Sequence, residues 1–96
     1  MNVESDEKAT IKMIIDSALH VVKNYISKEP DTIISVEGDD KEWTVVVEVL
    51  ERKVVPDTQD ILGRYEISLS LQGELLRWRQ TMIRRRSDLI EQTEEE

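Results

Sequence analysis

A strictly alternating segment followed by a turn limits what this chain can fold into. Residues 64–71 alternate between polar and apolar side chains, and one side carries the apolar set Tyr65, Ile67, Leu69 and Leu71. A period of two is typical of a β-strand with one buried face. Gln72-Gly73 then indicates a tight turn, and residues 74–83 are expected to form the returning strand.

The side chains of this hairpin favour one register. A two-residue loop at Gln72-Gly73 makes four cross-strand pairs: Ile67 with Trp78, Leu69 with Leu76, Ser68 with Arg77, and Glu66 with Arg79. One face is then apolar and the other carries an ion pair, as a one-sided sheet requires. A three-residue loop with Gly73 in the left-handed conformation would shift the register by one residue, which gives a poorer match.

The N-terminal part of the chain predicts a helix from about Asp6 to Lys28. Its apolar residues recur with the helical period: Ile11, Ile14, Ile15, Ala18, Val22, Tyr25 and Ile26. Ser5 is a candidate N-cap, and Pro30 is expected to end the helix at Glu29. The small side chain of Ala18 is the expected point of close approach to a sheet.

Two further β-rich segments complete the predicted fold. Residues 32–37 and 43–54 read as strands that are separated by a turn at residues 37–41. The expected class is α+β, with one N-terminal helix packed on a small antiparallel β-meander of about four strands. We expect a polar start at 1–5, a single domain at 6–86 and a charged, flexible tail at 87–96. The predicted core consists of Ile11, Ile15, Ala18, Val22, Ile67, Leu69 and Trp78.

Composition narrows the classes of function. The chain has 96 residues, no cysteine and a net charge of −8. That charge disfavours an ordinary nucleic-acid or anionic-membrane binder, and the absence of cysteine excludes disulfides and thiolate chemistry. We find no signal peptide and no apolar run long enough to span a membrane, so the expected location is the cytoplasm.

Few residues offer catalytic or metal-binding chemistry. His20 is the only histidine and falls opposite the apolar stripe of the helix. Glu48 and Glu51 are three apart on a strand, hence on opposite faces, and cannot act as an acid–base pair. Asp39-Asp40 indicates a solvated turn rather than a cation site, because the spacing of a calcium loop is absent. We therefore expect no enzyme, no cofactor and no metal.

The segment Pro56–Asp60 predicts a structured loop. Asp57 can cap a helical turn that begins at Thr58, and Asp60 stands at the third position of that turn. One reading is a rigid corner between two strands; the other is a loop that faces a partner.

The arginines divide the chain by charge. Residues 74–86 contain one acid and five arginines, here called the basic ridge: Arg77, Arg79, Arg84, Arg85 and Arg86. The segment carries +4, which leaves −12 for the rest of the chain. Such a ridge can pair with carboxylates of the same chain, dock an acidic protein or grip phosphates. Three consecutive arginines at 84–86 favour an exposed strand end over an internal ion-pair network.

Four segments resemble the gas vesicle protein O family in order and spacing. They are Trp43-Thr-Val-Val-Val-Glu48-Val-Leu-Glu51-Arg52, Val55-Pro56-Asp57-Thr58-Gln-Asp60-Ile-Leu, Tyr65-Glu66-Ile, and Gly73-Glu74-Leu-Leu followed by the arginine-rich end. The resemblance covers residues 43–86 and does not include the N-terminal helix.

The resemblance implies a cytoplasmic, non-enzymatic accessory protein of gas vesicle assembly, with association with the vesicle as a further expected location. Its partners would be other gas vesicle proteins, either the hydrophobic shell subunit or further accessory proteins. It implies no catalytic residue. Competing readings are a nucleic-acid-binding regulator that uses the basic ridge and a small hydrolase that uses carboxylates. The candidate partner-binding residues are the five ridge arginines with Asp57 and Asp60. The sequence leaves the direct partner and the oligomeric state open.

Overall fold

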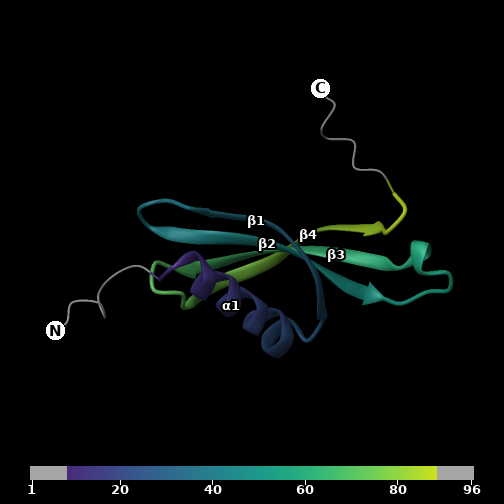
Figure 1. Cartoon of the computed structure of the whole chain (residues 1–96), viewed down its shortest axis with the longest axis horizontal. Coiled ribbons are helices and arrows are strands. Elements are labelled where there is room, and N and C mark those ends of the chain that lie inside the picture. Colours follow the sequence, from purple (N-terminus) through teal and green to yellow (C-terminus); the bar gives the residue numbers. More distant parts are fainter. Residues whose placement is uncertain (1–8, 89–96) are drawn as a thin grey trace, which may run out of the picture.

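The computed structural model describes residues 9–88 as a helical segment followed by four strands (Figure 1). The elements are α1 (Ile11–Val21), the π-helical turn η2 (Val22–Ile26), β1 (Glu29–Gly38), β2 (Glu42–Arg52), the 3-10 helix η3 (Asp57–Gln59), β3 (Ile61–Ser70) and β4 (Leu75–Arg85). All neighbouring strands are antiparallel, in the order β1-β2-β3-β4. The prediction of an α+β fold with one helix and a four-stranded meander is confirmed.

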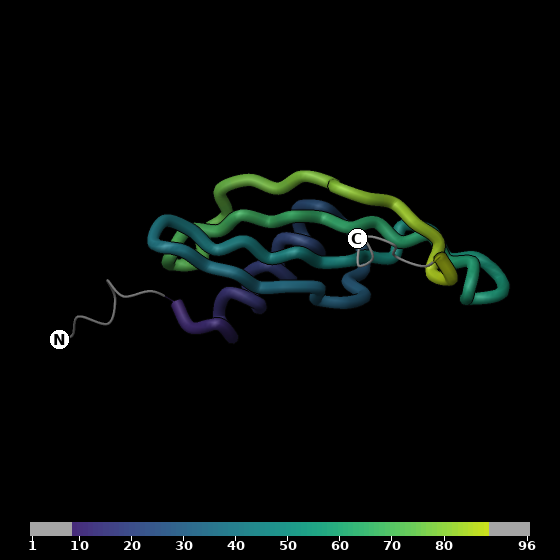
Figure 2. The backbone as a smooth tube through the Cα atoms, turned by 90° about the horizontal axis from the view of Figure 1, so that it is seen from above, coloured from purple at the N-terminus to yellow at the C-terminus, as the bar shows by residue number. Residues whose placement is uncertain are grey.

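The helix covers one face of the sheet only. α1 packs against β1, β2 and β3, and Figure 2 views the four strands from the opposite side, with the helix behind them. β4 therefore forms an edge of the sheet beyond the helix. We call the sheet face opposite α1 the open face.

Aliphatic side chains of the helix and of the two central strands form the core. The core residues with 0% exposure are Ile14, Ala18, Val22, Val45, Val47, Val49, Ile67 and Leu69. Burial of this size is the main force that holds a helix on a sheet.

Two residues of the predicted core lie at the surface instead. Ile11 is 56% exposed because it opens the first turn of α1, at the end of the packed region. Trp78 is 41% exposed because it sits on the edge strand β4. Ile15 is intermediate, and Ile14 takes the central position.

The helical segment, residues 11–26, spans the apolar pattern but is shorter than the predicted range of about Asp6 to Lys28. Thr10 is the N-cap, and its Oγ1 accepts a hydrogen bond from the backbone N–H of Met13 at 3.2 Å. The predicted cap, Ser5, lies outside the described residues. At the other end, Ser27 has a left-handed φ of 64° and reverses the chain after η2. Pro30 does not end the helix, since it already belongs to β1.

The hairpin between β3 and β4 combines both registers considered from the sequence. Three residues, 71–73, form the loop: the N–H of Ser70 bonds the carbonyl of Glu74 at 2.7 Å, and Gly73 has a φ of 93°. Leu69 therefore pairs with Leu75, not with Leu76. A register shift at Leu76 then restores the three other predicted pairs, Ile67 with Trp78, Ser68 with Arg77, and Glu66 with Arg79.

We expect Ile14→Ala to lower the free energy of unfolding by about 2–5 kcal/mol, because it leaves a cavity under the helix. Ile11→Ala makes the same chemical change at an exposed position of the same helix and should cost less than about 1 kcal/mol. Urea denaturation of both variants measures the difference. Equal losses would show that the helix is not packed through Ile14.

Candidate functional site

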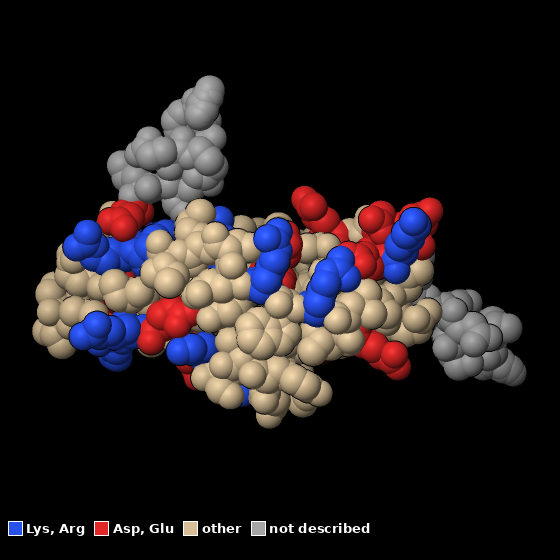
Figure 3. Space-filling model, turned by 180° about the vertical axis from the view of Figure 1, so that it is seen from behind, with Lys and Arg blue, Asp and Glu red and all other residues tan. Residues whose placement is uncertain are grey.

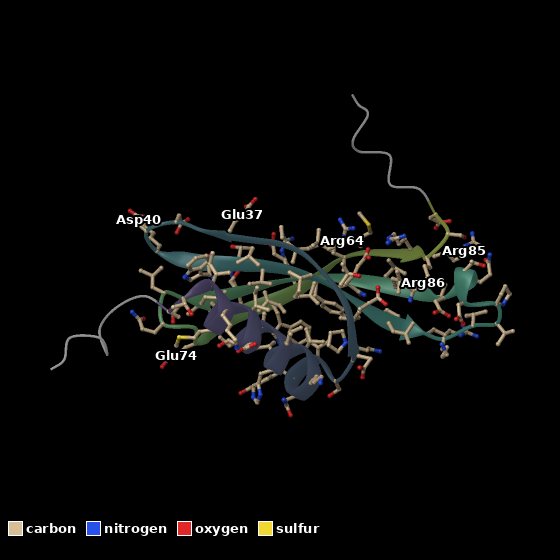
Figure 4. The ribbon with its side chains drawn as sticks, in the orientation of Figure 1. Glu37, Asp40, Arg64, Glu74, Arg85 and Arg86 are labelled. Carbon is tan, nitrogen blue, oxygen red and sulfur yellow. The ribbon has the colours of Figure 1, made fainter. Side chains whose placement is uncertain are left out.

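Charged and polar side chains populate the open face. Because strand residues alternate between faces, the strand register places these polar and charged residues there: Thr44, Glu48, Arg64, Glu66, Ser68, Arg77, Arg79 and Arg84. Figure 4 shows Glu37 and Arg64 on this side, directed away from the helix. Each candidate partner-binding residue can now be judged by its own contacts.

Glu48 is the buried centre of the open face. Its side chain is only 3% exposed. Arg84 of β4 binds it with two hydrogen bonds of 2.8 and 2.9 Å, and Arg64 of β3 adds one of 3.1 Å. A bidentate arginine–carboxylate pair is among the strongest polar contacts in proteins. The pair joins β2 to β4 across β3.

The rest of the Arg84 guanidinium holds the chain that follows β4. Its Nη1 donates to the backbone carbonyls of Arg85, Arg86 and Asp88 at 3.2–3.3 Å. Arg84 is therefore a structural residue, and the prediction that residues 84–86 form an exposed strand end rather than an internal ion-pair network was wrong for it. The sequence reasoning failed here because the partner carboxylate lies 36 residues away.

Arg86 and Asp60 are also bound within the molecule. The buried carboxylate of Asp60 accepts hydrogen bonds from the N–H of Val54 at 2.8 Å and from Arg86 at 3.4 Å. Arg86 also contacts Asp31 of β1 at 3.1 Å. These contacts tie the loop after β2 to the end of β4 and to β1. Asp60 therefore closes a corner of the fold, and its carboxylate is buried there.

Asp57 does not make the predicted capping contact. The residue before η3 is Pro56, and no side chain caps this short helix. The Asp57 carboxylate is exposed and lies 3.6 Å from Lys53. The capping prediction was wrong because η3 begins one residue earlier than the sequence indicates.

The remaining ridge arginines stay at the surface. Arg77 and Arg79 contact Glu42 and Glu66 at 2.8 and 3.0 Å, but their side chains are still 64% and 72% exposed. Arg85 is exposed as well, 3.8 Å from Asp88. The basic ridge thus divides into two bound arginines, 84 and 86, and three exposed ones.

The face under α1 contains a second carboxylate cluster, which the sequence analysis missed. Glu51 accepts hydrogen bonds from Tyr65 and Gln80, both at 2.9 Å, and lies 3.2 Å from Lys28. A side chain at Gly63 would collide with the Glu51 carboxylate. Gly63 was the signal in the sequence that could have indicated this cluster, because a glycine inside a strand often marks the close approach of another group. Burial and the bond to this carboxylate raise the pKa of Tyr65 to about 12.

The carboxylates at the centres of these two clusters do not converge on one site. Glu48 and Glu51 lie on opposite faces, as predicted, and the exposed His20 contacts Asn24 at 3.1 Å. Within residues 9–88, no three His, Cys, Asp or Glu side chains converge to hold a metal ion. No helix formed by these residues is long and apolar enough to cross a membrane.

Electrostatics make the Glu48 cluster sensitive to acid. The hydrogen bonds from Arg84, followed by those from Arg64, hold the pKa of Glu48 below its usual range, although burial opposes the shift. A lowered pKa in the folded state stabilises the fold above the pKa of the unfolded chain. That stability is lost as the pH falls through the lower, folded-state value.

We expect Glu48→Gln to cost about 3 kcal/mol at neutral pH, because it leaves two arginines without a buried counter-charge. The wild-type protein should lose stability below about pH 4, while the variant changes less over the same range. Glu66→Gln, which disrupts an exposed pair, is the matched control and should cost less than about 1 kcal/mol. Thermal unfolding from pH 2 to 7 measures both effects. Identical curves for the two variants would contradict the central role of Glu48.

Comparison with known proteins identifies the family. The model of the family described as gas vesicle synthesis protein GvpO matches residues 1–89. Gas vesicle protein O1 of Halobacterium salinarum is 39% identical over 75 residues, or 78% of this chain and 63% of that protein. Gas vesicle protein O of Haloferax mediterranei is 40% identical over 76 residues, or 78% of this chain and 54% of that protein.

A third relative matches a shorter part of the chain. Gas vesicle protein O of a Streptomyces strain is 43% identical over 51 residues, covering 53% of this chain and 40% of that protein. This chain thus spans about half to two thirds of the length of the Halobacterium and Haloferax proteins. No solved structure matches it. The resemblance noted in residues 43–86 is confirmed and extends through the N-terminal helix: the chain belongs to the gas vesicle synthesis protein GvpO family.

Proposed function

We propose that this chain is a non-enzymatic accessory factor that supports gas vesicle formation by binding other proteins of the gas vesicle system in the cytoplasm. Its family membership supports the link to gas vesicles. The proposal that it acts by binding rests on the surface of the edge strand β4.

That surface combines exposed apolar and basic side chains. We call it the β4 rim and define it as Leu76, Arg77, Trp78, Arg79 and Ile83. Its three apolar members are 41–61% exposed, and they lie beside two exposed arginines. Figure 3 views the molecule from the β4 side: Lys and Arg side chains stand in a row toward the open face, and uncharged atoms fill the area below them.

This composition is typical of a protein-binding surface. Tryptophan and arginine dominate the energetics of protein interfaces, and exposed apolar side chains in a cluster mark contact sites. A gas vesicle shell subunit or another accessory protein is the partner class we propose. Binding would escort an apolar subunit before it polymerises, or position it for nucleation.

The structure weakens the case for a nucleic-acid-binding regulator. Arg84 and Arg86 bind the buried carboxylates of Glu48 and Asp60, so the ridge does not present five arginines to phosphates. A protein with a net charge of −8 is also repelled by nucleic acid.

The test replaces the chain in vesicle-forming cells with a tagged copy. A Leu76→Ser, Ile83→Ser variant removes two exposed apolar side chains from the β4 rim. We expect it to lose gas vesicle proteins from the affinity-purified material and to lower the vesicle yield. The protein should still fold, because neither side chain is buried.

An Ile11→Ser, Met13→Ser variant is the matched control. It removes two apolar side chains of similar exposure from the helix, and it should bind and support vesicles as the wild type does. Normal vesicles with the rim variant, or nucleic acid in place of gas vesicle proteins among the purified partners, would overturn the proposal.

A further inference from the structure

We propose that the β4 rim binds its partner by strand addition, and that the occupant is an extended segment of another protein in which acidic and apolar residues alternate. This inference rests on the proposed function, because it names the binding mode and the chemistry of the partner. It follows from the backbone of β4, the charges on one side of it and the apolar side chains on the other.

The outer side of β4 offers backbone groups to a further strand. Within residues 9–88, β3 is the only strand that pairs with β4. Between register shifts at Leu76 and Thr81, residues 77–80 pair regularly with residues 65–68 of β3. In such a strand every second residue directs its N–H and C=O away from the neighbouring strand. These groups can pair with an added segment, as in other cases of β-strand addition.

The open-face side of this segment selects acidic residues. Arg77 and Arg79 project there, and an added strand would place one of its side chains about 5 Å from each. Their contacts with Glu42 and Glu66 leave most of each side chain exposed, so N–H donors remain for a second carboxylate. Acidic residues two positions apart in the partner would meet both arginines.

The opposite side of the segment selects apolar residues. Trp78 lies between the two arginines in sequence and faces the helix side of the sheet, where its ring meets that of Tyr65 edge-on at 5.9 Å. A groove of about 290 Å³ on the same side lies between the helical segment and the start of β4. Its lining mixes polar and apolar residues: Asp16, Ser17, His20, Val21, Tyr25, Gly73 and Leu75. An apolar partner residue between the two acids would lie against Trp78.

A second copy of this chain fits β4 poorly. Two-fold antiparallel pairing of two β4 strands through residues 77–80 would set Arg77 and Arg79 of one copy against arginines of the other. Like charges directly opposite are destabilising. Charge complementarity therefore favours an acidic segment of a different protein.

The test titrates the full chain with a synthetic peptide of eight residues that alternates Glu and Val, followed by NMR. We expect the largest shifts at the amides of residues 77–80 and slower hydrogen exchange at the outward-facing ones. Arg77→Ser with Arg79→Ser should weaken binding roughly tenfold. Lys12→Ser with Lys23→Ser removes the same charge from the helix surface and should leave binding within about twofold.

N-methylation of the peptide distinguishes strand addition from side-chain docking. In an extended peptide all Glu amides point to one edge and all Val amides to the other. Methylating one set should weaken binding at least about tenfold, and methylating the other should change it less than about twofold. Equal effects of both methylations, or tight binding of a Lys–Val peptide, would overturn the proposal.

Two results would assign the edge to another occupant and also overturn the proposal. One is a dimer in sedimentation experiments that the peptide dissociates, which would identify a second copy. The other is tighter peptide binding after neutralisation of Glu94, Glu95 and Glu96 to Gln, which would identify the chain's own acidic end.

If gas vesicle proteins co-purify but the peptide fails to bind, only the strand-addition inference falls. If the peptide binds but no gas vesicle protein co-purifies, only the proposed function falls.

Discussion

The carboxylate of Glu48 links three strands on the face of the sheet that the helix leaves uncovered. It belongs to β2 and is bound by Arg64 of β3 and Arg84 of β4, with little exposure of any of the three side chains. A buried carboxylate without partners costs several kcal/mol, so loss of these arginines would destabilise the fold. Because α1 packs on β1, β2 and β3, this pairing holds the end of β4, where the helix gives no support.

Local patterns predicted the elements of the fold but not their irregularities. The alternation in residues 64–71 and the helical stripe around Ala18 identify a hairpin and an amphipathic helix, since each depends on neighbours in sequence. The shift at Leu76 could not be predicted in this way. The three-residue loop with a left-handed Gly73 would by itself move Trp78 away from Ile67, and the shift at Leu76 restores that pair. Both the loop conformation and the strand pairing must be known before the shift can be placed.

The division of the basic ridge into bound and exposed arginines likewise depends on residues that are far apart in sequence. Net charge and the run at 84–86 show where the arginines gather, but burial is decided by carboxylates far away in sequence. Arg84 meets Glu48 and Arg86 meets Asp31 and Asp60 because the meander brings β1, β2 and β4 together at one end of the sheet. Arg77 and Arg79 lie nearer the turn at residues 71–73 and remain exposed. On the open face, the arginine near the end of β4 is therefore bound and stabilises the fold, whereas the two nearer the turn are exposed to solvent.

The two edges of the sheet differ in how they meet other chains. In β1, Pro30 lacks an N–H, and register shifts at Asp31 and Ile34 interrupt the backbone pattern, which are common protections against unwanted pairing. In β4 the regular segment at residues 77–80 is short, and its two arginines repel a second copy. An apolar edge without such charges would aggregate with itself. On the strand-addition proposal, the same two arginines oppose pairing of two β4 strands and select an acidic segment, so both effects would depend on Arg77 and Arg79.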